Sequence, residues 1–462
     1  MASISRQSCL GYTVICLLLI NVVLFFVGDA PAPYRIVGDA LGRFGFSGAD
    51  SDTVKGDDVS DSVAEPETAH EVELESLKDL CADTTWHKGL WVHCHSACGP
   101  NKKSFCMGLN NARNRVQTCV RLAIDAGAGV ILPSIATRDP NHLVNTGTDR
   151  SYCPDTWWDI ASLKDTMQTA CPQLKVEFCP PEDKPEIDRV ITVPFRRYLE
   201  ASHHTGSFHT LVDAALADAN LSVNDVSATD PLVIDFGDTY IGWNYRESGE
   251  LGTIRKALFR ALPFNRTLLD LSMRIFERPQ LRGGDFIGVH LRGESDWPAG
   301  FGTVQTQMAQ YVEAIEHIAA HPGGSGTRTV FVSCGDRGSI QTFREMLQPL
   351  GYEVYDKWGL LEDRPDDLQI VESQRFDQKA IIEYQVLVGA KYFIGVIMSS
   401  MSSMIAFART VDDEHDFFET YIYPNSSKHG LTRSYHDNMA VKGNMLTNLM
   451  VINGHDIMDS FP

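Results

Sequence analysis

Two basic side chains that can bind phosphate, His290 and Arg292, close an apolar run at 286–292. The run is predicted to be a buried strand, and side chains two residues apart on a strand share a face, roughly 7 Å apart. Both can therefore point at one ligand. An arginine in this position can hold a diphosphate through two parallel hydrogen bonds. The sequence thus predicts a site for a phosphate ester where this strand ends.

A serine-rich segment follows a second apolar strand, at 392–396. Ser399 and Ser400 open the next predicted helix, where serines are natural N-caps and free backbone N–H groups attract anions. If the two strands are neighbours in a parallel sheet, the hydroxyls, the amides and Arg292 form one cradle at the carboxyl ends of the strands. Such a cradle can hold a nucleoside diphosphate without a metal ion, and no Asp-x-Asp metal triplet lies near these strands.

A third candidate is the glycine-asparagine turn that contains Gly108, Asn110 and Asn111. Apolar residues at helical spacing, among them Val116 and Val120, follow it, so the turn is predicted to precede a helix. The unpaired N–H groups of a helix N-terminus can meet an anionic ligand. Because Asn also favours turns that have no function, this motif gains meaning only beside the other two.

The elements that must position these residues alternate along the chain. Apolar strands are followed by segments with helical spacing, which is the pattern of α/β layers around a mostly parallel sheet. The predicted fold class is therefore α/β. The clearest strands are expected at 130–133, 286–292, 329–333, 353–355 and 392–396, and the clearest helices at 304–320, 338–350 and 376–388.

The overall composition excludes several classes of protein. The chain has 462 residues, of which 43% are hydrophobic and 22% are charged, so it is neither fibrous nor wholly disordered and has room for two lobes. Its formal net charge of −20 would repel a phosphate backbone, so we expect no nucleic acid as a partner.

The N-terminal residues predict a membrane anchor. Residues 9–28 are uncharged and mostly apolar, and as a helix they are long enough to span a bilayer. Arg6 precedes the span and Asp29 follows it, which favours a cytosolic tail at 1–8 and a lumenal body, the type II topology. A cleaved signal peptide is the alternative. The acidic, Ser- and Gly-rich segment 29–80 is predicted to be a disordered stem.

Cysteine usage supports a lumenal body. Eight cysteines lie between Cys81 and Cys179 and allow up to four disulfides, which can pair in on the order of 100 ways. Cys334 stands alone in an apolar stretch and is predicted to be a buried free thiol. A zinc site at 93–95 with Cys98 is the alternative, although an oxidising lumen favours disulfides. Glycosylation triplets at Asn220, Asn265 and Asn425 fit the secretory pathway.

The order of the three motifs resembles that of the GDP-fucose protein O-fucosyltransferases. Residues 287–297 are similar to the HLR-x-x-SDW strand of that family, and 393–400 to its FIG-x-x-x-SS segment. Residues 106–111 look like its N-terminal glycine-asparagine loop, and all three motifs match the family's order within 89–410. The resemblance implies a GT-B fold, in which two Rossmann-like lobes hold GDP-fucose in a cleft. It also implies inverting transfer without a metal ion or another cofactor.

The resemblance further implies how the lumenal part is divided. A disulfide-rich lobe on the acceptor side would span 81–280, the lobe that binds the GDP-sugar would span 281–445, and a C-terminal tail would span 446–462. The implied partners are GDP-fucose, a protein or glycan acceptor, and the membrane through the N-terminal helix. The implied location is the membrane of the Golgi or the endoplasmic reticulum.

Roles for single residues come from the same resemblance. Arg292 would be catalytic, because it would hold the β-phosphate and stabilise the departing GDP. His290 would contact the ribose or a phosphate, and Ser399 and Ser400 would bind phosphate. Asp296 would orient Arg292 or touch the nucleotide.

Two positions depart from the family pattern. Glu383 stands where similar members carry an aspartate, and its carboxylate could accept hydrogen bonds from guanine N1–H and N2–H. In the N-terminal loop the register is open: either Asn110, as a catalytic residue, or Asn111 would stand near the sugar and the acceptor, next to Gly108. Spacing singles out no general base, and a dissociative departure of GDP reduces the need for one.

Each of these residues also has a purely structural interpretation. His290 could be a core histidine, Arg292 a partner of Asp296, Ser399 an N-cap and Glu383 an ion-paired residue. Two other functions compete with a fucosyltransferase. One is a catalytically silent protein of the same fold that binds glycans or proteins, and the other is a transferase that uses another GDP-sugar.

Overall fold

The computed structural model describes residues 69–423, apart from 96–107, 140–141, 180–186, 194–202, 205–207, 237–241, 244, 246, 298–302, 397–398 and 412–418. The predicted cytosolic tail, membrane anchor and C-terminal tail, and the predicted stem as far as residue 68, lie outside this range. Within the described part, no helix combines the length and the apolar character that crossing a membrane requires.

The first sheet is parallel throughout and has five strands in the order β5-β2-β1-β8-β6. Val92, Val130 and Ile234 lie fully buried in its three central strands, as expected of strands that are covered on both faces. The strands are β1 (Leu90–His93), β2 (Gly129–Leu132), β5 (Val176–Phe178), β6 (Val190–Thr192) and β8 (Leu232–Asp235).

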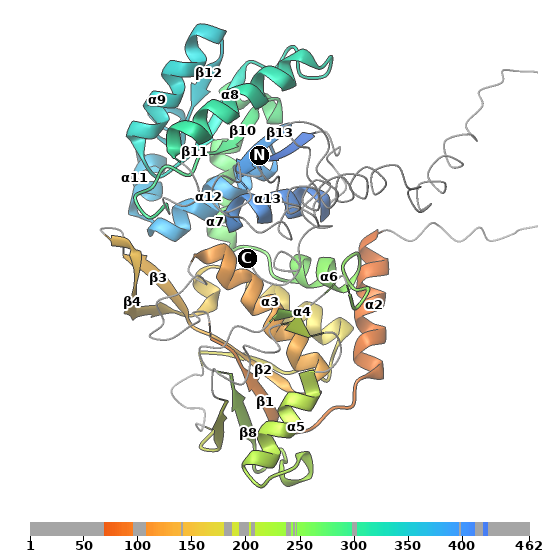
Figure 1. The fold of residues 1–462 in the computed structure, drawn as a ribbon. Helices are drawn as coiled ribbons and strands as arrows, with labels where there is room; N and C mark the ends of the chain where they lie inside the picture. Colours follow the sequence, from red (N-terminus) through yellow and green to blue (C-terminus); the bar gives the residue numbers. More distant parts are fainter. Residues whose placement is uncertain are drawn as a thin grey trace, which may run out of the picture. The chain divides into compact units, whose positions relative to one another are not determined.

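Helices cover this sheet, and α3 packs against both β1 and β2 (Figure 1). Outside the sheet, β3 and β4 form an antiparallel pair and β7 and β9 a short parallel one. The helices are α2 (Ala69–Asp83), α3 (Leu109–Asp125), α4 (Ile160–Ala170), α5 (Phe208–Asp218) and α6 (Ile254–Ala261), and the strands are β3 (Ile135–Asp139), β4 (His142–Tyr152), β7 (His203–His204) and β9 (Gly242–Trp243).

The second sheet is also parallel and has five strands in the order β12-β11-β10-β13-β14. Helices α12 and α13 pack against it (Figure 1). The strands are β10 (Ile287–His290), β11 (Thr329–Ser333), β12 (Glu353–Tyr355), β13 (Tyr392–Val396) and β14 (Thr420–Tyr423), and the helices are α7 (Arg266–Phe276), α8 (Val304–Ala320), α9 (Arg337–Leu347), α10 (Lys357–Leu360), α11 (Pro365–Ser373), α12 (Phe376–Val388) and α13 (Ser400–Val411).

Two parallel sheets, each with helices packed on it, confirm the predicted α/β fold of GT-B type with two Rossmann-like lobes. The lobes share apolar contacts. The rings of Phe259 and Phe407 lie 4.9 Å apart, and those of Phe264 and Tyr384 lie 5.1 Å apart, so aromatic side chains of α6 and its flank meet α13 and α12. These contacts join the two lobes through buried surface.

The predicted disordered stem, 29–80, is wrong at its C-terminal end, because helix α2 begins at Ala69. Leu77 and Cys81 of α2 are buried, and its Glu73 forms an ion pair of 2.8 Å with Arg260 of α6. The segment is acidic overall, but it also contains apolar residues at helical spacing. These residues are buried against the rest of the lobe. Tertiary packing therefore stabilises a segment that composition alone assigns to disorder.

The predicted boundary between the lobes at 280/281 also differs from the packing. Helix α7 lies before this boundary, yet it packs against α12 of the second lobe. Ser272 of α7 donates a hydrogen bond of 2.8 Å to the carbonyl of Ile382. The chain thus crosses to the second lobe before strand β10 begins.

Disulfides staple the first lobe, as predicted. The bonds are Cys81–Cys171, Cys94–Cys119 and Cys153–Cys179, while Cys98 and Cys106 lie outside the described residues. Cys334 is a buried free thiol, also as predicted, and burial raises its pKa to about 12. Because Cys94 is bonded to Cys119, it offers no thiolate to a metal, so the zinc alternative is wrong for this residue.

Candidate functional site

Strands β10 and β13 are neighbours in the second sheet and run parallel, with Val289 paired to Ile394. His290 ends β10 and Arg292 follows it, while Ser399 and Ser400 follow β13 and open α13. The carboxyl ends of parallel neighbours lie at one edge of a sheet. The structure thereby confirms the condition under which the sequence predicts a common site.

Arg292 lies in a cluster of carboxylates that belong to its own loop. Its Nη1 donates to Glu294, and its Nη2 donates to both oxygens of Asp296 at 2.8 Å. Burial opposes the charge of the guanidinium, but the two carboxylates more than offset this effect, so the pKa of Arg292 is raised. The pKa of Glu294 is lowered, because Arg292 and the Gly335 amide outweigh its burial. Arg292 and Glu294 are therefore both charged at neutral pH.

A second arginine, Arg138 on β3 of the first lobe, joins this cluster. Its side chain donates to Asp296, and its backbone N–H donates to Asp377 at the start of α12, at 3.2 Å. Burial raises the pKa of Asp377, although Arg138 opposes the shift. The sequence does not single out Arg138, because nothing in the short segment around it marks it as functional. Only the fold brings it to the motif that contains Asp296.

The His290 ring lies in the core of the second lobe. Its Nδ1 is 2.7 Å from Oγ of Ser402, a fully buried residue of α13, and the Ser402 hydroxyl also accepts a hydrogen bond from the Val396 N–H. Burial lowers the pKa of His290 to about 4, so the ring is neutral at physiological pH. The core interpretation of His290 fits this geometry, and Ser402, a residue outside the predicted site, is its partner.

Glycine makes the close approach of α13 to the sheet possible. A Cβ added at Gly395 of β13 would stand 2.5 Å from Oγ of Ser402. Ser399 is 8% exposed, and its backbone N–H and carbonyl bond to Val396 and Ser403. Ser400 is half-buried at the first position of the helix. Both serines therefore lie at the helix start, where the sequence predicts them.

Glu383 forms a buried ion pair. Lys357 of α10 donates to Oε1 of Glu383 at 2.9 Å and to the carbonyl of Cys334 at 3.3 Å. Burial raises the pKa of Glu383, and Lys357 only partly opposes this shift. The structure thus shows Glu383 as an ion-paired residue, and its partner Lys357 is not singled out by the sequence.

The glycine-asparagine turn stands at the N-terminus of α3. Gly108 caps the helix with φ of +116°, and a Cβ there would lie 3.2 Å from Nη2 of Arg138. Asn111 is 6% exposed, and the buried Oδ1 of Asn110 has no hydrogen-bond partner among the described residues. The turn thus lies beside Arg138, which connects it to the Arg292 cluster.

A cavity of about 460 Å³ lies elsewhere, between helices α4, α6, α12 and α13. Arg113, Phe259, Phe264 and Tyr384 are among the residues that line it, and none of the predicted site residues does so. The guanidinium of Arg113, which is buried beside this cavity, already donates hydrogen bonds to the carbonyls of Phe259 and Leu262. We therefore place the candidate site at the sheet edge, where charge and motif residues meet.

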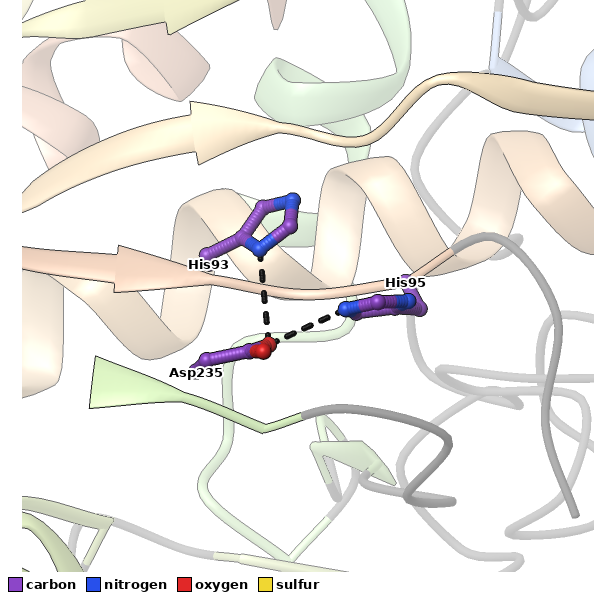
Figure 2. Close-up of side chains that lie close together, drawn as sticks. All are labelled: His93, His95 and Asp235. Carbon is purple, nitrogen blue, oxygen red and sulfur yellow. Dashed lines mark hydrogen bonds and ion pairs between the residues drawn. The ribbon is translucent and has the colours of Figure 1, made fainter. Parts of the chain in front are cut away.

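One group of side chains in the described part has the composition of a metal site: His93, His95 and Asp235 at the carboxyl edge of the first sheet (Figure 2). None of the three belongs to the motifs that define the candidate nucleotide site. The sequence singles out both histidines, together with Cys94 and Cys98, but not Asp235, which lies on another strand.

Comparison with known proteins identifies the family of this chain. The family model of the GDP-fucose protein O-fucosyltransferases matches residues 104–412. No curated protein sequence matches the chain. Among solved structures, the chain is similar to POFUT1 in complex with GDP-fucose (13% identity, 74% of this chain and 99% of that chain, TM-score 0.45), to the fucosyltransferase NodZ from Bradyrhizobium (12%, 75% and 98%, 0.37) and to a variant of Arabidopsis thaliana FUT1 in complex with GDP (12%, 80% and 82%, 0.43).

Proposed function

Because this chain belongs to the GDP-fucose protein O-fucosyltransferase family, we propose that it transfers fucose from GDP-fucose to a Ser/Thr hydroxyl of a protein or to a glycan. The transfer proceeds with inversion and without a metal ion. The observation that supports this most strongly is the meeting of Arg292 and the serine-rich start of α13 at one sheet edge. A departing nucleoside diphosphate needs such a fixed cation and such N–H and O–H donors.

Arg292 stabilises the leaving GDP in this proposal. As the sugar–phosphate bond breaks, negative charge grows on the β-phosphate, and a guanidinium fixed in a water-poor site stabilises that charge more than the ground state. Asp296 now accepts two hydrogen bonds from Nη2 of Arg292. A diphosphate replaces Asp296 there, because its oxygens also accept from the planar guanidinium and carry more charge. Asp296 keeps Arg138 as its partner.

The remaining donor contacts come from the neighbouring strand. The hydroxyls of Ser399 and Ser400 and the free N–H groups of α13 bind the phosphate oxygens. His290 adds no charge, because its lowered pKa of about 4 keeps the ring neutral, so it acts on the ribose or a phosphate only as a hydrogen-bonding group.

Glu383 can contribute to guanine recognition without giving up its ion pair. Lys357 bonds to Oε1 of Glu383, which leaves Oε2 to accept the N1–H or the N2–H of guanine. Breaking such a buried pair typically costs about 3–5 kcal/mol, so we expect Lys357 to stay in place when the nucleotide binds.

Asn110 and Asn111 serve the acceptor side of the reaction. The buried Oδ1 of Asn110, which has no partner among the described residues, can accept a hydrogen bond from a sugar or acceptor hydroxyl and orient it. No carboxylate is needed as a strong base in this proposal, because departure of GDP precedes full attack by the hydroxyl. The hydroxyl becomes strongly acidic as its oxygen bonds to the sugar, and its proton passes to the departing diphosphate.

A catalytically silent protein of the same fold, which binds glycans or proteins, is the second candidate. One observation favours it: Arg292 and Glu383 both have protein partners, Asp296 and Lys357, and could serve stability alone. In that case GDP-fucose would neither be consumed nor be needed for the partner to bind.

The enzyme works, in this proposal, in the Golgi or the endoplasmic reticulum as a single-pass type II membrane protein. The disulfides of the first lobe support an oxidising compartment. The apolar run at 9–28 supports the anchor. Fusion of residues 1–35 to a fluorescent reporter tests both, because retention in the membrane fraction with a lumenal reporter is expected.

A thermal-shift panel tests the donor site. The full-length protein is heated with GDP, UDP, CDP or ADP, and a ligand at 100 times its dissociation constant adds about 2.7 kcal/mol to the stability of the folded state. We expect a large shift with GDP alone, unchanged by EDTA. Equal shifts with all four nucleotides, or a GDP shift that EDTA removes and Mn²⁺ restores, would contradict the proposal.

Turnover separates the two candidate functions. Release of GDP from GDP-fucose is measured alone and with disulfide-rich protein domains or glycans as acceptors. We expect hydrolysis that the right acceptor accelerates. A clear GDP shift with no turnover under any of these conditions would favour the silent protein.

A further inference from the structure

Three side chains with metal-binding atoms converge at the carboxyl edge of the first sheet (Figure 2). His93 is the last residue of β1, His95 follows two residues later, and Asp235 is the last residue of β8. His93 and Asp235 are register partners in the parallel pair of these strands. Since side chains alternate along an extended chain, His93 and His95 project to one face. Strand register thus places the three groups together.

The spacing of the ligand atoms fits a small divalent ion. Oδ1 of Asp235 lies 3.4 Å from Nδ1 of His93 and 3.0 Å from Nε2 of His95. All three atoms lie within 4.8 Å of one another. A tetrahedral zinc ion with bonds of about 2.0–2.2 Å holds neighbouring ligand atoms about 3.3 Å apart. The spacing of 3.4 Å matches this value, the spacing of 3.0 Å is about 0.3 Å shorter, and the ring nitrogens lie within 4.8 Å of each other.

Both imidazole rings converge on one oxygen of the Asp235 carboxylate, rather than on two separate acceptors. Here the rings of His93 and His95 lie 4.8 Å apart, centre to centre, and both point at Oδ1 (Figure 2). This is the arrangement that a bound cation completes.

The chain around the histidines is held in place. Cys94 stands between them, points to the opposite face and bonds to Cys119 of α3. Arg115 of α3 donates to the backbone carbonyl of His95. The disulfide anchors the end of β1 and also removes the thiol from the set of ligands, which therefore consists of two nitrogens and one oxygen.

Partial exposure leaves room for a further ligand. The side chains of His93 and His95 are each 28% exposed and that of Asp235 is 18% exposed, so an ion can enter and water can coordinate it. Imidazole and carboxylate together suit zinc and its neighbours, whereas magnesium and calcium prefer all-oxygen sites.

We propose that His93, His95 and Asp235 bind a divalent transition-metal ion of the zinc class, with solvent in the open position. The site uses strands of the first lobe, and none of its ligands takes part in the proposed binding of GDP through Arg292 and Ser399. It therefore does not depend on the proposed fucosyl transfer, and it leaves donor binding independent of metal.

Cobalt titration of the full-length protein, stripped of metal with a chelator, tests the site. We expect one Co²⁺ per chain, with visible absorption bands of a low-symmetry site and no thiolate charge-transfer band, and displacement of Co²⁺ by Zn²⁺. Loss of one ligand, in Asp235→Asn, should weaken binding at least about tenfold. The double variant His93→Gln/His95→Gln should abolish it.

The matched control is the double variant His317→Gln/His321→Gln. These two rings of the second lobe lie 4.9 Å apart, as close as the candidate pair, but no carboxylate joins them in a three-ligand group within the described residues. Metal binding should be unchanged in this control. The GDP thermal shift should survive in every variant and so report that each of them is folded.

Three results would overturn the proposal: no saturable Co²⁺ binding by the wild-type protein, unchanged binding in the His93→Gln/His95→Gln variant, or a charge-transfer band that reports a cysteine ligand. If the His93→Gln/His95→Gln variant does not fold, Asp235→Asn decides, because it keeps the shape of the side chain. A wild-type protein that binds Co²⁺ but shows no GDP shift would reject the proposed function alone.

Discussion

The carboxyl edges of the two sheets occupy equivalent places in their lobes, yet they present different chemistry. At the edge of the first sheet, His93, His95 and Asp235 are partly exposed. At the edge of the second, Arg292 is enclosed by Glu294 and Asp296, and the three side chains are 14%, 10% and 8% exposed. The first edge presents two imidazoles and one carboxylate, whereas the second presents a guanidinium whose charge two carboxylates already balance.

This difference shows that the fold determines where side chains come together, whereas the residue types determine which ligand they can bind. Parallel strands bring their carboxyl ends to one edge in both lobes. Two imidazoles with one carboxylate suit a metal cation, while a guanidinium beside a helix N-terminus suits a phosphate. The predictions below ask whether the two edges are as independent as this contrast implies.

The largest effect is expected for Arg292→Ala, which should lower turnover about 10²- to 10³-fold, because one preorganised donor to the developing charge is lost. Arg292→Lys should recover little, since an ammonium cannot reproduce the planar fork. Steady-state assays of GDP release measure kcat for each variant.

Arg337→Ala is the matched control, because Arg337 is an exposed arginine of the same lobe that pairs with Glu372. It should keep wild-type turnover. If Arg292→Ala lowered the melting temperature but left activity per folded molecule intact, Arg292 would be only the structural partner of Asp296.

Loss of a disulfide should destabilise the first lobe more than the second. The bond Cys81–Cys171 closes a loop of 90 residues between helices α2 and α4 of the first lobe, and removal of a disulfide typically costs about 2–4 kcal/mol. The Cys81→Ser/Cys171→Ser variant should therefore lose hydrogen-exchange protection in β1 and β2 before β10 and β13. Equal loss in both sheets would show that the lobes unfold as one unit.

Cys334 of the second lobe is a free thiol, in contrast to the disulfide-bonded cysteines of the first lobe. Its thiol is buried, and its pKa is raised to about 12, so alkylation at neutral pH should label it only after unfolding. Cys334→Ser should leave protection of the first lobe unchanged. Rapid labelling of native Cys334 would contradict its place in the core.

The last effect is expected from a change of pH and concerns His290. Burial lowers the pKa of His290 from 6.5 to about 4, so between these two pH values the unfolded chain binds a proton at this residue and the folded chain does not. The contribution of neutral His290 to the free energy of unfolding is therefore fully present above pH 6.5. It falls by about 3 kcal/mol as the pH drops from 6.5 to 4.

Denaturant titration of the wild-type protein and of His290→Gln between pH 7 and pH 4 measures this contribution. The slope of the unfolding free energy against pH should be shallower in the variant, whatever its absolute stability. Identical slopes would mean that His290 titrates normally, and hence that the edge of the second sheet is as open to water as the first.

Much of the second lobe follows from local patterns. Continuous apolar runs predict buried parallel strands, and β10, β11 and β13 lie where these runs occur. The edge strand β12 also lies where the sequence predicts a strand. Arg292 and the serine pair can be linked by residue order alone, because that order resembles a family whose model indeed matches the chain. The acidic composition around helix α2 predicts disorder, whereas the helix is stabilised by packing its apolar face against α6 and α4.

The sequence by itself determined the α/β class, the disulfide-rich first lobe and the residues that end β10 and precede α13, because these depend on spacing over a few residues. Only the tertiary structure decided which distant side chains meet. Arg138 reaches Asp296 from the other lobe, and Asp235 joins His95 across 140 residues of chain. No local pattern encodes such pairs, because the distance between the two side chains depends on how strands far apart in the chain pair. The charge of each side chain depends in addition on how deeply the fold buries it.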